Sequence, residues 1–273
     1  MDNTISTAPF SIDWPSVMLT CLVIAALLES VAPARPSEHL VRRWVNNISL
    51  SIITYCFTHF VITACMIQVL KSIDQTPLID FSSLPLWFTV PLGVLTYELV
   101  VFALHVMSHK VPLFWRLHSI HHSDPQVDVS TSFRHHPFES LISVIPMMAV
   151  AIYVGFPLEA VLTYRLLDLI QKILTHANIK IPDGLEATVG RLFVTPRFHR
   201  GHHFADKRHT DSNYGAVFPW FDFLFNTYQK TKLSEDLKEP LGLGLSDVDS
   251  TRLDRLLLLP LERTNPDSPQ QLH

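Results

Sequence analysis

The sequence is poor in cysteine and in charged residues for a chain of 273 residues. Its three cysteines lie in apolar stretches and form no CxxC pair, so the sequence supports neither a thiolate metal site nor a disulfide framework. Lys and Arg are scattered and form no basic stripe, which removes nucleic acid from the expected partners. No Lys or Arg precedes the first apolar run, so a cleavable signal peptide is not expected.

Apolar residues are abundant, at 48% of the sequence, and the mean hydropathy of +0.23 is high for a soluble domain. A helix of about 20 apolar residues crosses the hydrocarbon core of a bilayer. Gly155, Phe156 and Pro157 form a turn-like break that predicts a helical hairpin. The predicted fold class is an all-α integral membrane protein, a transmembrane helix bundle. The expected apolar helices, of which the first three are spans, are 14–32, 44–70, 84–107, 138–154 and 158–174.

The charges in the loops predict an orientation. The loop between the first two spans holds Arg35, Arg42 and Arg43, whereas the next loop holds only Lys71 with acidic neighbours. Loops rich in Lys and Arg stay in the cytosol. The end of the third span, and the histidines that follow it, should then face the cytosol.

The second helix of the hairpin carries charges within its apolar sequence, at Arg165, Asp168 and Lys172. Charged side chains at membrane depth are costly and usually face protein or water. Asp168 and Lys172 are four residues apart, which is the spacing of a helical ion pair. We therefore expect this helix to line a polar site or to lie partly at the membrane interface.

Histidine is in excess: the chain has 15, and 12 of them lie from His105 to His209. His105 and His109 are four residues apart, which places both rings on one face of a helix, where they can share a metal. The pattern HxxHH then occurs twice, and its spacing turns the last two rings to either side of the first, which suits two metals. Pro196 and Gly201 predict that the second copy lies at the start of a helix. The two copies are His118, His121 and His122, and His199, His202 and His203.

Further histidines lie between and after these clusters. His176 follows the hairpin, and His135 and His136 precede Pro137. Because proline biases its predecessor toward extended geometry, His135 and His136 should point in roughly opposite directions, and only one can easily face the metals. Metal-bound histidines usually donate their second nitrogen to a carboxylate or carbonyl. The candidates for such a supporting role are His135, Asp211, His209 and Asp124.

Three functions fit an imidazole-rich site in a membrane protein. Imidazole suits zinc, copper, iron and nickel. A zinc hydrolase would use a metal-bound water, but no HExxH is present to supply a protease's general base. A non-catalytic membrane metal-binding or transport protein is the alternative, although transporters place their ligands at mid-membrane and these follow the spans. The third function, an O2-dependent lipid oxidoreductase, rests on the resemblance described next.

Residues 97–228 resemble the fatty acid hydroxylase superfamily, which includes sterol desaturases and alkylglycerol monooxygenase. There are departures from the usual pattern: Phe221 replaces a Trp, Asn226 replaces a Gly, and Lys172 stands where some members have a histidine. The matching motifs are His105-xxx-His109, His118-xx-His121-His122, Arg134-x-His136-Pro137, His199-xx-His202-His203, Asn213-Tyr214-Gly215 and the closing run 221–228.

The resemblance implies a membrane-embedded four-helix core under a cytosolic histidine-rich cap that holds a dimetal centre with two iron ions. It implies O2-dependent hydroxylation or desaturation of a lipid, with electrons from an external donor such as ferredoxin or cytochrome b5. The family has histidine directly before the proline, so the resemblance favours His136 over His135 as a ligand. The implied ligands are His105, His109, His118, His121, His122, His136, His176, His199, His202 and His203.

The expected organisation is an N-terminal tail at 1–13, one membrane-embedded domain at 14–228 and a C-terminal extension at 229–273. Within the extension, the apolar stretch 253–261 is too short to span and predicts a short packed helix, and 264–273 predicts a loose tail. Short loops favour a multi-pass protein of a bacterial inner membrane over one of the endoplasmic reticulum.

Overall fold

The computed structural model describes residues 12–72, 77–81, 83–244 and 250–262. Across these residues the chain is helical and forms no strand, so the all-α prediction is confirmed. The predicted tail at 264–273 and most of the tail at 1–13 lie outside the described residues. The longer elements are α1 (Trp14–Val31), α2 (Leu40–Ser72), α3 (Leu86–Lys110), α4 (Pro112–His122), η1 (Val129–Phe133), α5 (Pro137–Tyr153) and α6 (Leu158–His176). The shorter elements are α7 (Asp183–Val189), α8 (Pro196–His202), α9 (Lys207–Thr210), α10 (Trp220–Phe225), α11 (Leu233–Asp236), α13 (Leu253–Leu258) and η2 (Leu259–Leu261).

Three helices, α1, α2 and α3, are long and apolar enough to cross a membrane, as the sequence predicted. Their apolar side chains face outward: Leu19 and Leu27 of α1 are 61% and 60% exposed, which suits contact with lipid. The start of α2 differs from the prediction, because Arg42 and Arg43 lie in its first turn and not in a loop. Arg43 is drawn into the protein there by buried carboxylates.

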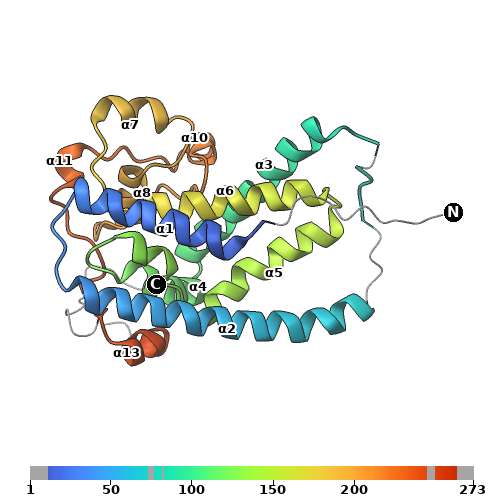
Figure 1. Ribbon diagram of the computed structural model, residues 1–273, viewed down its shortest axis with the longest axis horizontal. Helices are drawn as coiled ribbons and strands as arrows, with labels where there is room; N and C mark the ends of the chain where they lie inside the picture. The colour runs from blue at the N-terminus through green and yellow to red at the C-terminus, as the bar shows by residue number, and fades with distance from the viewer. Residues whose placement is uncertain (1–11, 73–76, 82, 245–249, 263–273) are drawn as a thin grey trace.

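The predicted helical hairpin forms from α5 and α6. Gly155 in its turn has φ +82°, and a Cβ there would lie 2.5 Å from the side chain of Pro77, so only glycine fits. Helix α3 packs closely on α6: a Cβ at Gly93 would come within 2.7 Å of Ala160. Tyr97 also stacks on Tyr164, at 5.5 Å between ring centroids. This close contact brings the last turns of α3 and α6 to the same end of the bundle (Figure 1).

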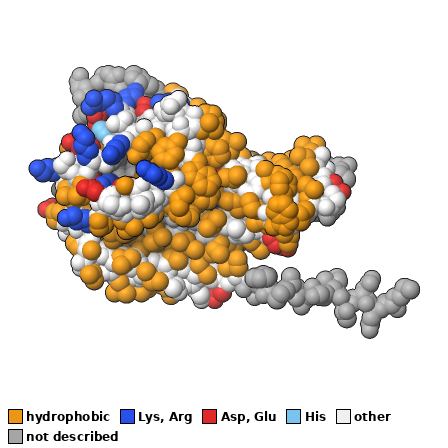
Figure 2. Space-filling model, turned by 90° about the horizontal axis from the view of Figure 1, so that it is seen from above, with side chains coloured by type: hydrophobic (Ala, Val, Ile, Leu, Met, Phe, Trp, Pro, Cys, Tyr) orange, Lys and Arg blue, Asp and Glu red, His pale blue; other side chains and the backbone are white. Residues whose placement is uncertain are grey.

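The short helices gather at that end and form a cap, defined here as residues 111–136 and the described residues from 177 to 262 (Figure 1). The Lys and Arg side chains visible in Figure 2 concentrate over this end, whereas the rest of the visible surface is mainly apolar. The predicted short helix at 253–261 forms as α13 and η2, and Leu256 of α13 packs on Leu50 of α2 and Ile120 of α4. The division at residue 228 stays a prediction.

Buried ion pairs fasten the cap to the spans. Arg43 Nε donates to Asp124 Oδ1 at 2.9 Å, and Arg43 Nη1 donates to Asp128 Oδ2 at 2.7 Å. Arg134 Nη1 donates to Asn47 Oδ1 at 2.9 Å, also from cap to α2. Breaking one side of a buried pair costs several kcal/mol, roughly 3–5, because it leaves an uncompensated charge. The cap is therefore tied rigidly to the cytosol-predicted ends of the helices.

A labelling experiment tests the topology. In a variant whose native cysteines are replaced by serine, we expect Ser37→Cys and Lys207→Cys to be protected from an impermeant thiol reagent in intact cells. Leu78→Cys should react. The Leu78 N–H donates to the Tyr153 carbonyl, which places residue 78 beside the hairpin turn, at the end of the bundle opposite the cap. Labelling of only one of the two cap positions would refute their placement on one side of the membrane. Labelling of both would refute the cytosolic orientation.

Candidate metal centre

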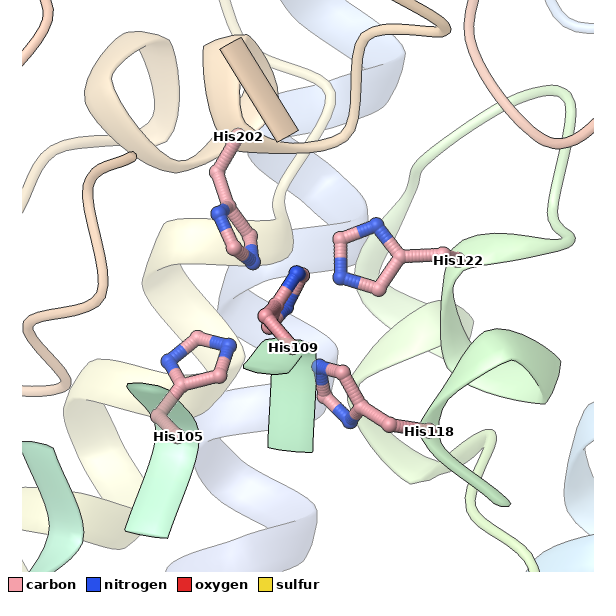
Figure 3. A group of neighbouring side chains, drawn as sticks. All are labelled: His105, His109, His118, His122 and His202. Atoms are coloured by element: carbon pink, nitrogen blue, oxygen red, sulfur yellow. The ribbon is translucent and has the colours of Figure 1, made fainter. Parts of the chain in front are cut away.

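Five histidine rings converge in the first of two groups, which we name group one: His105, His109, His118, His122 and His202. One nitrogen from each ring lies within 4.8 Å of the nitrogens of all the others. Figure 3 shows the rings turned toward a shared centre from three elements, α3, α4 and α8. Group one is thus built by segments almost 100 residues apart in the sequence.

A sharp break between α3 and α4 creates this convergence. Val111 is extended, with φ −94° and ψ 118°, and Pro112 starts α4 because its missing N–H has no helical partner to lose. The chain turns back there, so His105 and His109 on the last turns of α3 face His118 on α4. The ring centroids of His109 and His118 are 4.9 Å apart.

Group two consists of His121, His176, His199 and His203. The Nε2 atom of His176 lies 3.1 Å from that of His121 and 2.9 Å from that of His199. The Nε2 atoms of His199 and His203 are 3.2 Å apart. Each HxxHH copy is divided between the groups, since adjacent residues on a helix point about 100° apart.

The two groups adjoin each other. The rings of His122 in group one and His203 in group two stack with their centroids 4.4 Å apart. His121 and His203 come from different cap helices and approach to 4.6 Å within group two. One compact site therefore holds nine histidines in two sets.

Hydrogen bonds on the outer nitrogens fix the direction of four rings. In group one, Nδ1 of His105 lies 2.7 Å from Tyr214 O, and Nδ1 of His202 lies 2.6 Å from Ser212 O. Nδ1 of His118 lies 2.7 Å from Glu139 Oε1, and Nδ1 of His176 lies 2.7 Å from a backbone carbonyl one turn earlier. With Nδ1–H as donor, the inward Nε2 carries a lone pair, which is the arrangement that metal-bound histidines usually show.

The inward nitrogens of group one have no hydrogen-bond partner within the described residues. Nε2 of His105, His118, His122 and His202 is buried without a hydrogen bond, and both nitrogens of His109 are unpartnered. A buried polar atom without a partner costs roughly 1–3 kcal/mol. Several such atoms aimed at one point fit a metal ion, which would coordinate them all.

The protonation state of the cap histidines also fits a metal. Burial, reinforced by neighbouring imidazoles, lowers the pKa of His121 and His122 well below the ordinary value. The same causes lower the pKa of His199, His202 and His203. These rings are therefore neutral at pH 7, and the neutral imidazole is the form that binds metals.

Residues 90–227, just over half of the chain, match the sequence profile of the fatty acid hydroxylase family. The chain belongs to the fatty acid hydroxylase family. The matched region contains all nine histidines of the two groups. No solved structure matches the chain.

The names of several curated relatives describe enzymes that modify lipids. Ornithine lipid hydroxylase of Rhizobium tropici is 28% identical over 53% of this chain and 43% of its own length. Alkylglycerol monooxygenase of Caenorhabditis elegans is 31% identical over 54% of this chain and 27% of its own length. The human alkylglycerol monooxygenase is 25% identical over 84% of this chain and 48% of its own length. The chain thus spans less than half the length of each of these relatives.

The prediction that His136, and not His135, binds metal stays a prediction, but the geometry of the two side chains favours His135. His136 starts α5, where its Nδ1 accepts the Phe138 N–H at 3.2 Å and its ring stacks on Phe138. His135 points to the opposite side, as expected of the pair, and stacks on His121 at 4.7 Å. Its Nε2 is buried without a hydrogen-bond partner, beside group two but outside both groups.

Two of the predicted supporting residues lie away from the histidine groups. Asp124 does not bond to a histidine, because it is occupied by Arg43 and by Thr131 Oγ1. His209 Nδ1 lies 3.7 Å from Asp206, outside both groups. Proximity to the HxxHH copies in the sequence does not bring them to the rings, because Asp124 follows the end of α4 and turns to Arg43, and His209 lies six residues beyond His203.

Two carboxylates do lie beside the rings. Asp211, a predicted supporting residue, has Oδ1 3.7 Å from His109 Nδ1 and binds Lys110 at 2.9 Å. Glu139 is also among the acids close to the histidines in the sequence, and its Oε1 accepts from both His118 at 2.7 Å and His135 at 3.0 Å. The available signal was its position four residues after His135, on the first turn of a helix.

A cavity of about 150 Å³ reaches both groups of this family member. Its wall includes His105 and His118 of group one, and His121, His176 and His199 of group two. Apolar side chains of α3, charged side chains of α5 and α6, and Gly215 with Ala216 also line it. A substrate in this cavity would lie against both sets of rings.

Alanine variants separate His135 from His136. His135→Ala removes a buried imidazole beside group two that also bonds to Glu139, so we expect the affinity for metal to fall by about tenfold or more. His136→Ala removes a helix cap, so we expect a loss of about 1 kcal/mol in stability with metal content retained. Metal titration and thermal unfolding of the purified variants measure both. Loss of metal in His136→Ala with none in His135→Ala would refute this assignment.

Proposed function

We propose that this protein hydroxylates a lipid with O2 at two iron ions, one in each histidine group. The observation that carries the proposal is the convergence of nine buried imidazoles, with unpartnered nitrogens, at the end of membrane-crossing helices. The names of two relatives, a lipid hydroxylase and an alkylglycerol monooxygenase, support oxygen insertion over other metal chemistry.

Group one would hold one ion and group two the other, with His135 as a further ligand beside group two. Bound iron would supply the redox chemistry that O2 requires and that no protein side chain offers. In the overall reaction one oxygen atom enters a C–H bond and the other leaves as water. Two electrons and two protons come from an external donor, such as ferredoxin or cytochrome b5.

The protein's own residues hold the rings still. Glu139 bonds His118 of group one and His135 beside group two, so it couples the orientation of both sets. Asp222 is fully buried and accepts N–H bonds from Tyr214 and Gly215, which fixes the Tyr214 carbonyl that orients His105. A site held this firmly loses little on reorganisation when substrate binds.

Glu98, on α3, also holds part of the site in place. Its Oε1 accepts N–H bonds from Ala216, Val217 and Phe218 at 2.9–3.1 Å, and Tyr164 donates to its other oxygen. These bonds attach the 214–218 segment, one wall of the cavity, to α3 and α6. These bonds therefore fix the position of the cavity wall relative to the histidines of α3.

The lipid would enter sideways from the bilayer, since the cavity lies where α3, α5 and α6 converge. We place the site on the cytosolic side of a multi-pass membrane protein, most simply a bacterial inner membrane. A transporter would hold its ligands at mid-membrane. Here they lie at the ends of the helices and in the cap, which favours catalysis at the membrane surface.

Isotope labelling tests the activity. Cells expressing the protein under isotopically heavy oxygen gas should accumulate a lipid that carries one heavy oxygen atom, detected by mass spectrometry. His202→Ala, which removes a group-one ring, should abolish that product while the protein still reaches the membrane. A lipid that only loses two hydrogens would replace hydroxylation with desaturation. No lipid change, together with altered metal content of the cells, would contradict the proposal and favour metal transport.

A further inference from the structure

Two charged side chains of α6, Asp168 and Lys172, line the cavity among the histidines. Both are partly buried. Their spacing suited an ion pair with each other, but neither forms an ion pair within the described residues. A charge in such a place usually has a partner, because isolation at this depth is costly. The cavity therefore contains two charged side chains that no ion pair within the described residues neutralises.

Lys172 lies next to the candidate metal centre. Its carbonyl oxygen accepts the Nδ1–H of His176, one turn later in group two. The side chains of Lys172, His135 and His176 line the same cavity. The ammonium has three donors and no acceptor, so its natural partner is an anion.

The surrounding acids do not supply that anion. Glu139 also lines the cavity, but two histidine N–H groups already occupy it. Asp168 lies one turn farther from the histidines along α6, and its charge would repel an anion that bound there. An anion in the cavity is thus directed to Lys172, on the side of the metal centre.

The cavity admits only part of a lipid. Its volume of about 150 Å³ is below the roughly 300–1,000 Å³ typical of sites that enclose a whole ligand. A water molecule takes about 30 Å³, so the space fits a small polar group and a few carbons. The rest of a lipid chain would stay between the helices or in the bilayer.

We propose that Lys172 binds the anionic group of the lipid substrate, a carboxylate or a phosphate, so that the polar end of the lipid enters the cavity first. The carbon that is oxidised then lies within a few bonds of that group and not at the far end of the chain. This inference rests on the proposed lipid hydroxylation at the histidine groups.

Binding of three probes with the same chain tests it: palmitate, hexadecyl phosphate and hexadecanol. Calorimetry on the purified, metal-loaded protein in nanodiscs should show at least one anionic probe binding about tenfold or more tighter than hexadecanol, as expected of a charge-assisted hydrogen bond. Whether palmitate or hexadecyl phosphate is preferred identifies the anion as carboxylate or phosphate.

Variants assign the preference to Lys172. Lys172→Met should remove it, Lys172→Arg should keep it, and Lys180→Met, a matched change at an exposed lysine just beyond the same helix, should leave it intact. Lys172→Gln is the second neutral variant, and thermal unfolding confirms that each variant is folded. Equal binding of hexadecanol, or a preference that survives both neutral variants, would overturn the inference.

Two outcomes separate this inference from the proposed function. A lipid that gains heavy oxygen in cells, combined with no anion preference in the binding assay, would leave the hydroxylase and remove the role of Lys172. Anion binding that depends on Lys172, with no oxidised lipid in cells, would keep the role of Lys172 as a binding residue and refute the hydroxylase.

Discussion

Neutral imidazoles that are buried with their lone pairs converging are unstable unless something binds them. Each unpartnered buried nitrogen costs free energy, and nine rings in one site multiply that cost. Metal ions bound at the two groups would remove it by coordinating the inward nitrogens, while carbonyls and Glu139 already satisfy the outer nitrogens of His105, His118 and His202. The close packing of α3 on α6 and the buried ion pairs of Arg43 serve to hold these rings in place.

The sequence predicts features that depend on local pattern. Long apolar runs predict α1, α2 and α3, and Gly155 with Pro157 predicts the hairpin, because turn chemistry and hydropathy act over a few residues. The HxxHH spacing predicts that each copy serves two sites, and the structure divides both copies in that way. Helical geometry alone is sufficient for this, since adjacent rings diverge whatever surrounds them.

Features that depend on contacts between distant segments are not predictable in this way. Pro137, the first residue of α5, correctly predicts that His135 and His136 point apart, but only packing against α4 decides which of them lies beside the rings. The sequence predicts Arg43 in a loop, because its partners Asp124 and Asp128 lie over 80 residues later in the chain and only the fold brings them together. Glu98 looks like an isolated charge in a span, yet it binds three backbone N–H groups of the cap.

The central claim is that two separate histidine groups each hold one metal ion, and counting iron tests it most directly. Protein loaded with ferrous iron without oxygen, and then desalted, should carry two ions per chain by elemental analysis. His109→Ala with His202→Ala, and separately His176→Ala with His199→Ala, should each leave one. Zinc in place of iron would not contradict the claim, because imidazole sites favour zinc over ferrous iron. A single ion per chain in the unchanged, folded protein would contradict it.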